Sequence, residues 1–431
     1  MDLVRGSWDA DRLQSDLRAS PPVAIGVSAY TEGAELACEV IRSCKSALPG
    51  CPVVAGGPHF TFLPEEGLDA GAEVVVLYEG EGPLIAVLEH LKAPEALPVD
   101  RVRGVAFRRN GKLHRTPPRE RINGLDHLPF SPKLVHGQSD KSKVHVLSSR
   151  GCPGRCLFCA SGAFSGRRAR CESAERVFSM LWAAARVRQR QLVVSFVDDI
   201  FTVDRRRLGD VFRWAKDAGL GIQWEARCRV DQMTGPFLRF LADAGCRSLH
   251  LGVESADQAV LDSLDKRISI ESFFANYEHL LTNGIEPRCS FMIGHHTDTR
   301  ASIERTVVLA AAIEARGIGV VVLGISTPFP GTPLRERASA LGVTIPARNW
   351  RTYSTRRPVC TAPGFSSEDL RRALHLFEED KERVLSAPFL TTGEPGAEEF
   401  REQVLNWAER MSRAVRPGPA SRADGCRSGR P

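Results

Sequence analysis

The sequence lacks the features that would assign it to several broad classes of protein. It contains no run approaching the roughly 20 consecutive apolar residues that a membrane-spanning helix needs. Its first residues, MDLVRGSWDADRLQSDL, mix acidic with basic side chains and include no apolar stretch typical of a secretory signal. There is no lysine-rich run, no basic stripe interleaved with aromatic residues and no internal repeat. We therefore expect a cytoplasmic protein without a membrane or nucleic-acid partner.

The composition is that of a globular protein with a small net charge. Apolar residues make up 42% of the 431 residues and charged residues 26%, which argues against wholesale disorder. A chain of this length is expected to form two or three domains. The net charge of +6 is spread over 58 basic and 52 acidic residues, so it gives little support for a nucleic-acid surface.

Three of the twelve cysteines form a motif, and the other nine are isolated and are interpreted mostly as small buried hydrophobic residues. Cys152, Cys156 and Cys159 are spaced as C-x3-C-x2-C in GCPGRCLFCASGAF. A structural zinc site would need four ligands, and no second cysteine pair or histidine follows at the required spacing. Three thiolates can instead bind three irons of a four-iron, four-sulfur cluster and leave the fourth iron open to a non-protein ligand. A non-catalytic protein with a structural zinc or cluster site remains the alternative.

From about residue 144 to 330, six apolar strand-like runs alternate with amphipathic helical runs, several of which end in glycine. This pattern predicts a parallel sheet curled into part of a barrel, with its chemistry at the carboxyl ends of the strands. The cysteine loop follows the first strand. Polar residues at the other strand ends should face the same cavity: Asp198, Asp199, Arg227, Arg229, Glu254, Ser255, Ser290, His295, His296, Ser326 and Thr327.

The cysteine motif and several later segments together resemble a radical S-adenosylmethionine (SAM) enzyme. The resemblance covers about residues 141–335 and includes FVDDIFTVD, WEARCRVD, GVESADQAVLDSLDK and STPFPGTPL. It belongs to the branch that often carries an N-terminal cobalamin-binding domain, the class B methyltransferases. It implies a partial (β/α)6 TIM-type barrel and a [4Fe-4S] cluster held by Cys152, Cys156 and Cys159. It also implies that SAM chelates the open iron and is cleaved by one electron to methionine and a 5′-deoxyadenosyl radical.

The resemblance also assigns residues around SAM. It places Phe158 on the adenine side and the strand end of Asp198 and Asp199 near the methionine amine. Arg229 and Glu254, which Ser255 follows, match positions near the carboxylate and ribose. One segment departs from the family, because a Gly-Leu-Pro-Gly-Glu-Thr-like turn is replaced by GHHTDT at residues 294–299. His295 and His296 could reach substrate, but we expect them to be surface loop residues.

Residues 22–92 read as alternating strands and helices with glycine at strand ends. They resemble the latter part of a cobalamin-binding domain in VAIGVSAY, AGGPH and VVLYEGEGP. The resemblance implies that Ser28, Gly56 and Gly57 lie along the nucleotide tail of cobalamin. It implies base-off cobalamin, because no Asp-x-His-x-x-Gly sequence supplies a cobalt ligand. Such a domain usually has two further βα units before this point, so we expect a truncated Rossmann-like domain over residues 1–95.

The remaining segments complete an α/β architecture. Residues 96–140 are interpreted as a linker containing a hairpin with Asn110-Gly111 at its turn. The barrel over residues 141–335 is followed by a helical region at 336–415, expected to cap the barrel mouth, and by a disordered tail at 416–431.

The expected reaction is methyl transfer to an unactivated carbon or phosphorus of a small-molecule substrate. An unactivated C–H bond has no useful acidity, so acid–base residues alone cannot open it, whereas a radical cofactor can. A rearrangement, oxidation or ring contraction without methyl transfer is the enzymatic alternative. The resemblance further implies an external electron donor such as flavodoxin or ferredoxin.

Overall fold

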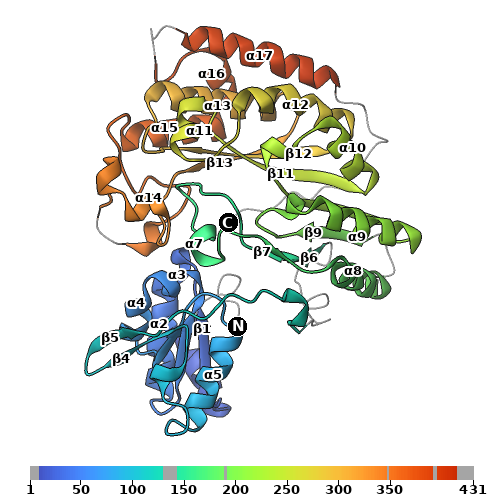
Figure 1. Ribbon diagram of the computed structural model, residues 1–431. Helices are drawn as coiled ribbons and strands as arrows, with labels where there is room; N and C mark the ends of the chain where they lie inside the picture. The colour runs from blue at the N-terminus through green and yellow to red at the C-terminus, as the bar shows by residue number, and fades with distance from the viewer. Residues whose placement is uncertain (1–8, 130–142, 189–191, 347–348, 392–395, 415–431) are drawn as a thin grey trace.

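The computed structural model describes residues 9–129, 143–188, 192–346, 349–391 and 396–414. Two sheets dominate it, one in an N-terminal domain and one in a larger barrel-like domain (Figure 1). In Figure 1 the N-terminal domain lies below the larger one, and the helices of the C-terminal region lie at the top. In the described part of the chain, no helix is both long enough and apolar enough to cross a bilayer.

The N-terminal sheet has the order β1-β2-β3-β4-β5. Strands β1 (Ile25–Ser28), β2 (Val53–Gly56) and β3 (Val74–Val76) are parallel, and the hairpin of β4 (Val105–Arg109) and β5 (Lys112–Arg115) adds antiparallel to β3. The accompanying helices are α1 (Ala10–Ala19), α2 (Ala34–Ala47), α3 (Gly57–Phe62), α4 (Pro64–Asp69) and α5 (Glu81–Lys92). The hairpin turn at Asn110-Gly111 is as expected. The hairpin nevertheless extends this sheet instead of lying in a separate linker, because Val105, Ala106 and Phe107 are buried beside β3.

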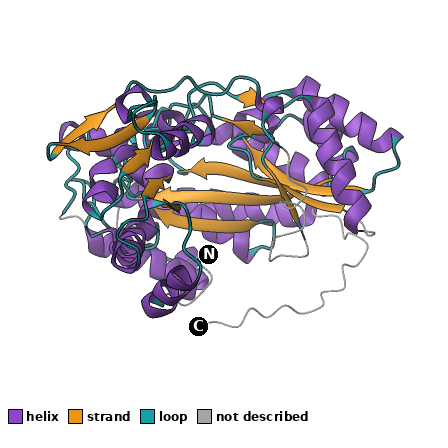
Figure 2. Cartoon of the chain, turned by 90° about the horizontal axis from the view of Figure 1, so that it is seen from below, coloured by secondary structure: helices purple, strands orange, loops and turns teal. Residues whose placement is uncertain are grey.

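The larger domain is an open parallel sheet of six strands in the order β13-β12-β11-β10-β9-β6. Its strands are β6 (Val144–Val146), β9 (Leu192–Phe196), β10 (Ile222–Cys228), β11 (Cys246–Glu254), β12 (Glu286–Ile293) and β13 (Val320–Ile325). The helices between them are α8 (Ala174–Arg188), α9 (Arg205–Asp217), α10 (Gly235–Asp243), α11 (Gln258–Ser263), α12 (Ile270–Thr282) and α13 (Arg300–Ala315). Figure 2 shows the long strands side by side with helices packed along the sheet. The predicted partial (β/α)6 barrel is confirmed.

Alternate residues of each barrel strand face opposite sides, as the two-residue period of a strand requires. On β12, Cys289, Phe291 and Ile293 are buried in the main core and Pro287 is buried on the same side, while the intervening residues are partly or fully exposed. The core therefore lies between the sheet and the helices. The residues on the opposite, concave face of the sheet are partly exposed, whereas those inside a closed TIM barrel are packed into a core.

The C-terminal helices α15 (Ser367–Glu379), α16 (Lys381–Ser386) and α17 (Ala397–Ala414) pack against the outer helices α12 and α13. The Glu304 carboxylate fixes them by accepting hydrogen bonds from Arg401 at 2.6 Å and from the backbone N–H of Thr391 at 3.0 Å. These helices therefore pack on the outside of the barrel, and Leu370 of α15 also reaches Gly294 at the carboxyl end of β12. The tail at residues 416–431, which we expect to be disordered, lies outside the described residues.

The segment before α15 instead joins the two domains. The Trp350 indole N–H donates to the Glu66 carboxylate at 2.8 Å, and the backbone of Gly331 lies directly against the Phe62 ring of α3. A Cβ on Gly331 would approach that ring within 2.3 Å, so only glycine permits this packing.

Candidate active site

The three motif cysteines lie on the loop between β7 (Ser149–Arg150) and α7 (Ser161–Phe164) and are all half-buried and free. A Cβ on Gly154 would lie 3.2 Å from Cys152 Sγ and 3.7 Å from Cys156 Sγ, so both sulfurs turn toward this glycine. The backbone N–H groups of Gly154 and Ser161 donate to the sulfurs of Cys152 and Cys159, each at 3.4 Å. Such donors favour the thiolate form that binds iron.

The donor set of this loop fits a cluster better than a single ion. Burial raises the pKa of Cys159 to about 11 and also raises the pKa values of Cys152 and Cys156, so these thiols ionise at neutral pH only with a bound metal. Among the described residues, no three His, Cys, Asp or Glu side chains are placed to hold one metal ion. A zinc site requires all its ligands around one atom, whereas in a four-iron cluster each thiolate binds a different iron.

Backbone contacts fix the cysteine loop on both sides. The N–H of Leu157 donates to the Leu264 carbonyl at 3.0 Å, and the Leu157 carbonyl accepts from the N–H of Leu334 at 2.8 Å. Leu334 belongs to α14 (Pro333–Glu336), which follows the last barrel strand. The Leu157 side chain is buried with Val260, Leu264 and Leu334. The ligands are therefore held by segments from two other strand ends of the barrel.

The two adjacent aspartates at the end of β9 have different surroundings. Asp198 is fully buried and accepts hydrogen bonds from the backbone N–H and hydroxyl of Ser148 and from the hydroxyl of Ser149. It thereby fixes the chain that leads into the cysteine loop. Asp199 is exposed and accepts from the Ser161 hydroxyl at 2.5 Å. Of these two residues expected near SAM, only Asp199 has a carboxylate open to a ligand.

Glu254 and Arg229 both lie beside the cysteine loop. Glu254 forms a buried ion pair with Lys266, with Oε1 and Nζ 2.7 Å apart, and the Lys266 ammonium lies 5.7 Å from the centre of the Phe158 ring. Burial alone would lower the pKa of Lys266, but the charges of Glu254 and Cys156 raise it above its ordinary value. A guanidinium nitrogen of Arg229 lies 3.8 Å from the Cβ position of Gly154. These charges surround the loop that would carry the cluster.

Lys266 could not be predicted from any motif; it follows Glu254 by twelve residues and lies just after the turn that ends α11. Ser255 is not brought into this group. Its hydroxyl lies 3.2 Å from the Thr306 hydroxyl and accepts from the N–H of Asp257, so it joins β11 to the outer helices.

The expectation of a surface position is wrong for His295. Its side chain is completely buried, and its ring centre lies 5.8 Å from that of Phe158. The pKa of His295 is lowered to about 3, chiefly by burial. The loop turns inward because the Asp298 carboxylate accepts from the N–H groups of Gly294 and His295. His296 is partly exposed.

The turn around Asp298 leads to a testable prediction of pH dependence. Burial raises the pKa of Asp298 to about 6, so the folded state resists its ionisation. The contribution of Asp298 to the free energy of unfolding should be at its full value below about pH 4. It should fall by about 2–3 kcal/mol as the pH rises past 6. Asp298→Asn can still pair with the Ser302 hydroxyl and should remove this loss. Urea unfolding from pH 4 to 7 measures both proteins; a steeper loss in the variant would contradict the prediction.

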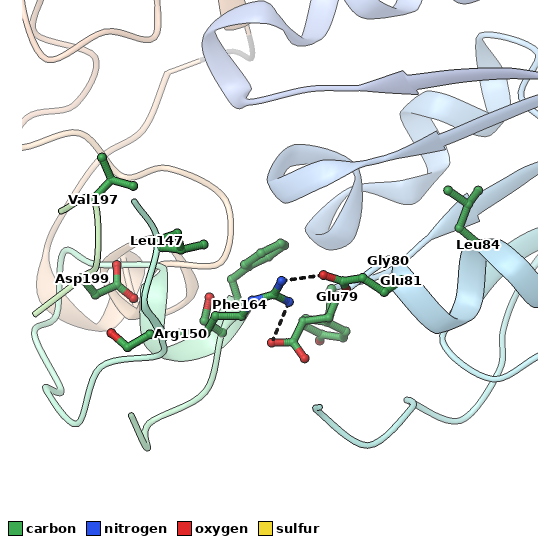
Figure 3. Close-up of a pocket in the computed structure, with 12 residues that line it drawn as sticks. Glu79, Gly80, Glu81, Leu84, Leu147, Arg150, Phe164, Val197 and Asp199 are labelled. Atoms are coloured by element: carbon green, nitrogen blue, oxygen red, sulfur yellow. Dashed lines mark hydrogen bonds and ion pairs between the residues drawn. The ribbon is translucent and has the colours of Figure 1, made fainter. Parts of the chain in front are cut away.

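A cavity of about 460 Å³ lies where the N-terminal domain meets the barrel mouth (Figure 3). The N-terminal domain contributes Tyr78, Glu79, Gly80, Glu81 and Leu84, and the barrel domain contributes Leu147, Ser149, Arg150, Phe164, Ser165, Val197 and Asp199. Arg150 bridges the two sides, with a guanidinium nitrogen 2.6 Å from Glu81 and another 3.7 Å from Glu79. The cavity therefore opens beside α7, the helix that follows the cysteine loop.

The N-terminal residues expected to contact cobalamin lie together at the carboxyl ends of β1 and β2. Ser28 is exposed at the end of β1 and pairs in register with Gly56. Gly57 has φ +90°, and a Cβ there would lie 2.5 Å from Ser28 Oγ and 2.9 Å from the backbone of Ala29. Only glycine fits this turn, which sits where α/β sheets bind nucleotide-like ligands.

Gly57→Val is expected to reduce cobalamin binding at least about tenfold, because its side chain must displace the Ser28 end of the site. Cobalamin uptake and iron content are measured together, with iron content expected to stay unchanged. Gly26→Ala on β1 is the control, since a Cβ there meets nothing within 4 Å. Undiminished uptake by Gly57→Val would show that the site lies elsewhere.

Comparisons with known proteins agree with these two domains. A family model for the radical SAM superfamily matches residues 146–310, and one for the B12 binding domain matches residues 2–88. An uncharacterized methyltransferase of Pyrococcus horikoshii is 31% identical over 364 residues, which cover 82% of this chain and 77% of the relative. Cytidylyl-2-hydroxyethylphosphonate methyltransferase of Streptomyces wedmorensis is 24% identical over 422 residues, 88% of this chain and 78% of that protein.

A solved structure shares the fold over nearly the whole chain. The radical SAM methyltransferase TsrM from Kitasatospora setae, with cobalamin and a [4Fe-4S] cluster bound, superposes with a TM-score of 0.66 at 16% identity. The match covers 94% of this chain and 92% of TsrM. Together with the cysteine loop and the strand-end glycines, these comparisons show that the chain belongs to the radical SAM enzymes with a B12-binding domain, whose cofactors are a [4Fe-4S] cluster, SAM and cobalamin.

Proposed function

We propose that this enzyme transfers a methyl group to an unactivated carbon or phosphorus atom of a small-molecule substrate. In this reaction the cluster and SAM supply a 5′-deoxyadenosyl radical and cobalamin supplies the methyl group. The observation that carries the proposal is the cavity of about 460 Å³ at the domain seam. It lies between the N-terminal domain and α7, so a substrate there is flanked by the sites of both cofactors.

The residues of the chain have separate tasks in this proposal. Cys152, Cys156 and Cys159 hold the cluster, and Phe158 packs beside SAM. Arg229 and the ion pair of Glu254 with Lys266 provide charges next to the cluster loop for the polar groups of SAM. Leu147, Leu84, Phe164 and Val197 give the cavity an apolar lining against which the apolar part of a substrate can pack.

The N-terminal domain supports cobalamin binding without a histidine ligand to cobalt. His59 follows the Gly56-Gly57 pair, but it is buried and its ring nitrogens are occupied. One lies 3.2 Å from the Thr31 hydroxyl and the other 3.0 Å from the Glu66 carboxylate. Its ring also packs edge-on against Trp350. His59 is therefore held away from a ligand, which supports the base-off form.

Product analysis tests the proposal against radical chemistry without methyl transfer. The reconstituted enzyme is incubated with SAM, cobalamin, candidate substrates and a flavodoxin or ferredoxin as the proposed electron donor. Methyl transfer by the proposed route yields S-adenosylhomocysteine as well as 5′-deoxyadenosine. A rearrangement, oxidation or ring contraction yields 5′-deoxyadenosine without S-adenosylhomocysteine, and that result would overturn the proposal. Candidate acceptors with carbon and with phosphorus centres separate the two kinds of methylation.

A further inference from the structure

The concave face of the barrel sheet is an open surface and not part of the packed core. Val322 of β13 is 63% exposed and Leu147, just beyond β6, is 49% exposed, whereas their sequence neighbours Val321 and Val146 are buried. Leu147 also lines the seam cavity. The concave face is therefore accessible and continues at its upper edge into the proposed reaction site.

Three nitrogen-bearing side chains meet on this face in the middle of the sheet. The strand register pairs Arg227 of β10 with His250 of β11, and His250 with Arg288 of β12. Paired residues on neighbouring strands lie about 5 Å apart, and all three belong to the partly exposed face. Burial lowers the pKa of His250; the charge of Glu225 opposes this shift, while the charges of Arg288 and Arg227 add to it.

The two arginines are incompletely neutralised. Arg227 is exposed and donates to the carbonyls of Val197 and Asp198 at 3.1 and 3.3 Å, and it forms no ion pair with any described residue. The Nε–H of Arg288 donates to the exposed carboxylate of Glu286 at 3.0 Å. The remaining N–H groups of both guanidinium groups have no protein acceptor in the described part of the chain.

The other charges on this face do not cancel the excess. Glu225 lies on the same face of β10, two residues before Arg227, and forms an ion pair with Lys143 at 2.9 Å. Burial alone would raise the pKa of Glu225, but Lys143 and the charge of Arg288 keep it below its usual value. Among the described charged groups on this face, the three cations Lys143, Arg227 and Arg288 outnumber the two carboxylates Glu225 and Glu286 by one. A concave surface concentrates this field on a ligand inside it.

We propose that this surface, formed by Arg227, His250 and Arg288, binds the anionic end of the substrate. Guanidinium groups bind carboxylate and phosphate oxygens through paired N–H donors, which fixes orientation as well as charge. The exposed valines Val320 and Val322 offer an apolar flank for the rest of the molecule. The inference rests on the proposed function and assigns its substrate class: an organic carboxylate or phosph(on)ate whose apolar part extends toward the barrel mouth.

Calorimetric binding of three six-carbon probes to the full-length, cluster-reconstituted protein tests the inference. Hexylphosphonate and hexanoate carry the two anionic groups, and hexanol carries none. We expect both acids to bind more tightly than hexanol, and the tighter of the two identifies the substrate's acid group. Arg227→Gln and Arg288→Gln should each weaken binding of the acids at least about tenfold, as expected when a charge-assisted contact is lost.

Two matched variants separate recognition from folding. Arg227→Lys retains the charge and should bind the acids more tightly than Arg227→Gln. Arg213→Gln removes an exposed arginine that pairs with Asp210 on α9 and should bind like the wild type. Equal binding of hexanol and the acids, or equal binding by Arg227→Gln and Arg213→Gln, would overturn the inference. The measurement involves no turnover, so a failure of methyl transfer with intact acid binding would count against the proposed function alone.

Discussion

Cys156→Ala is expected to lose the cluster and all formation of 5′-deoxyadenosine from SAM. The three cysteines are the only ligands the loop provides, so two remaining thiolates cannot hold a cluster with one open iron. Cys152 Sγ and Cys156 Sγ both turn toward Gly154, so removing Cys156 takes away one of the sulfurs gathered on this side of the loop. Iron and sulfide analysis after anaerobic reconstitution, followed by product quantification, measures both effects.

Cys171→Ala is the matched control for this variant. Cys171 is also half-buried and free and lies on β8 (Arg170–Cys171), which pairs with the strand leading into the cysteine loop. The control should keep its iron and its SAM cleavage. Continued 5′-deoxyadenosine formation by Cys156→Ala would refute the assignment of the ligands.

Lys266→Met is expected to lower the free energy of unfolding by about 3–5 kcal/mol, because it leaves the Glu254 carboxylate buried without its partner. The side chains of Lys266 and Glu254 are only 11% and 7% exposed, so water cannot replace the lost ammonium. SAM binding to the reconstituted protein should fall as well, since the pair lies beside Phe158. Urea unfolding and equilibrium SAM binding measure the two effects separately.

The double variant Glu254→Gln/Lys266→Met separates stability from SAM binding. It removes both charges, so most of the lost stability should return, as when other buried ion pairs are replaced by neutral side chains. SAM binding should remain weak, because neither charge is present. Recovery of SAM binding together with stability would show that the pair supports the fold without contributing to the SAM site.

Local patterns allowed much of this architecture to be predicted. The cysteine motif lies within eight residues, and the βα units show themselves as apolar runs followed by amphipathic ones, so the loop and the open barrel could be predicted from neighbouring residues. The Asn110-Gly111 turn was equally local. The two strands of this hairpin join the N-terminal sheet, however, because they are buried against β3. That pairing joins residues about thirty positions apart, which the sequence pattern does not show.

The parts that could not be predicted depend on contacts between distant segments. Asp198 and Asp199 are adjacent and chemically identical, yet only the structure shows that Ser148 and Ser149 occupy the first. His295 reads as a polar loop residue, but hydrogen bonds to Asp298 turn it inward against Phe158. The cavity at the domain seam and the row of Arg227, His250 and Arg288 likewise arise only when separate strands pair.

The central claim is that three cysteines on one loop hold a four-iron cluster whose open iron binds SAM. Anaerobic reconstitution with iron and sulfide, followed by metal analysis and electron paramagnetic resonance of the reduced protein, tests it most directly. We expect about four irons and four sulfides per chain and a resonance signal that changes when SAM is added. A protein that stays colourless, or that holds one zinc ion tightly in place of iron, would contradict the account.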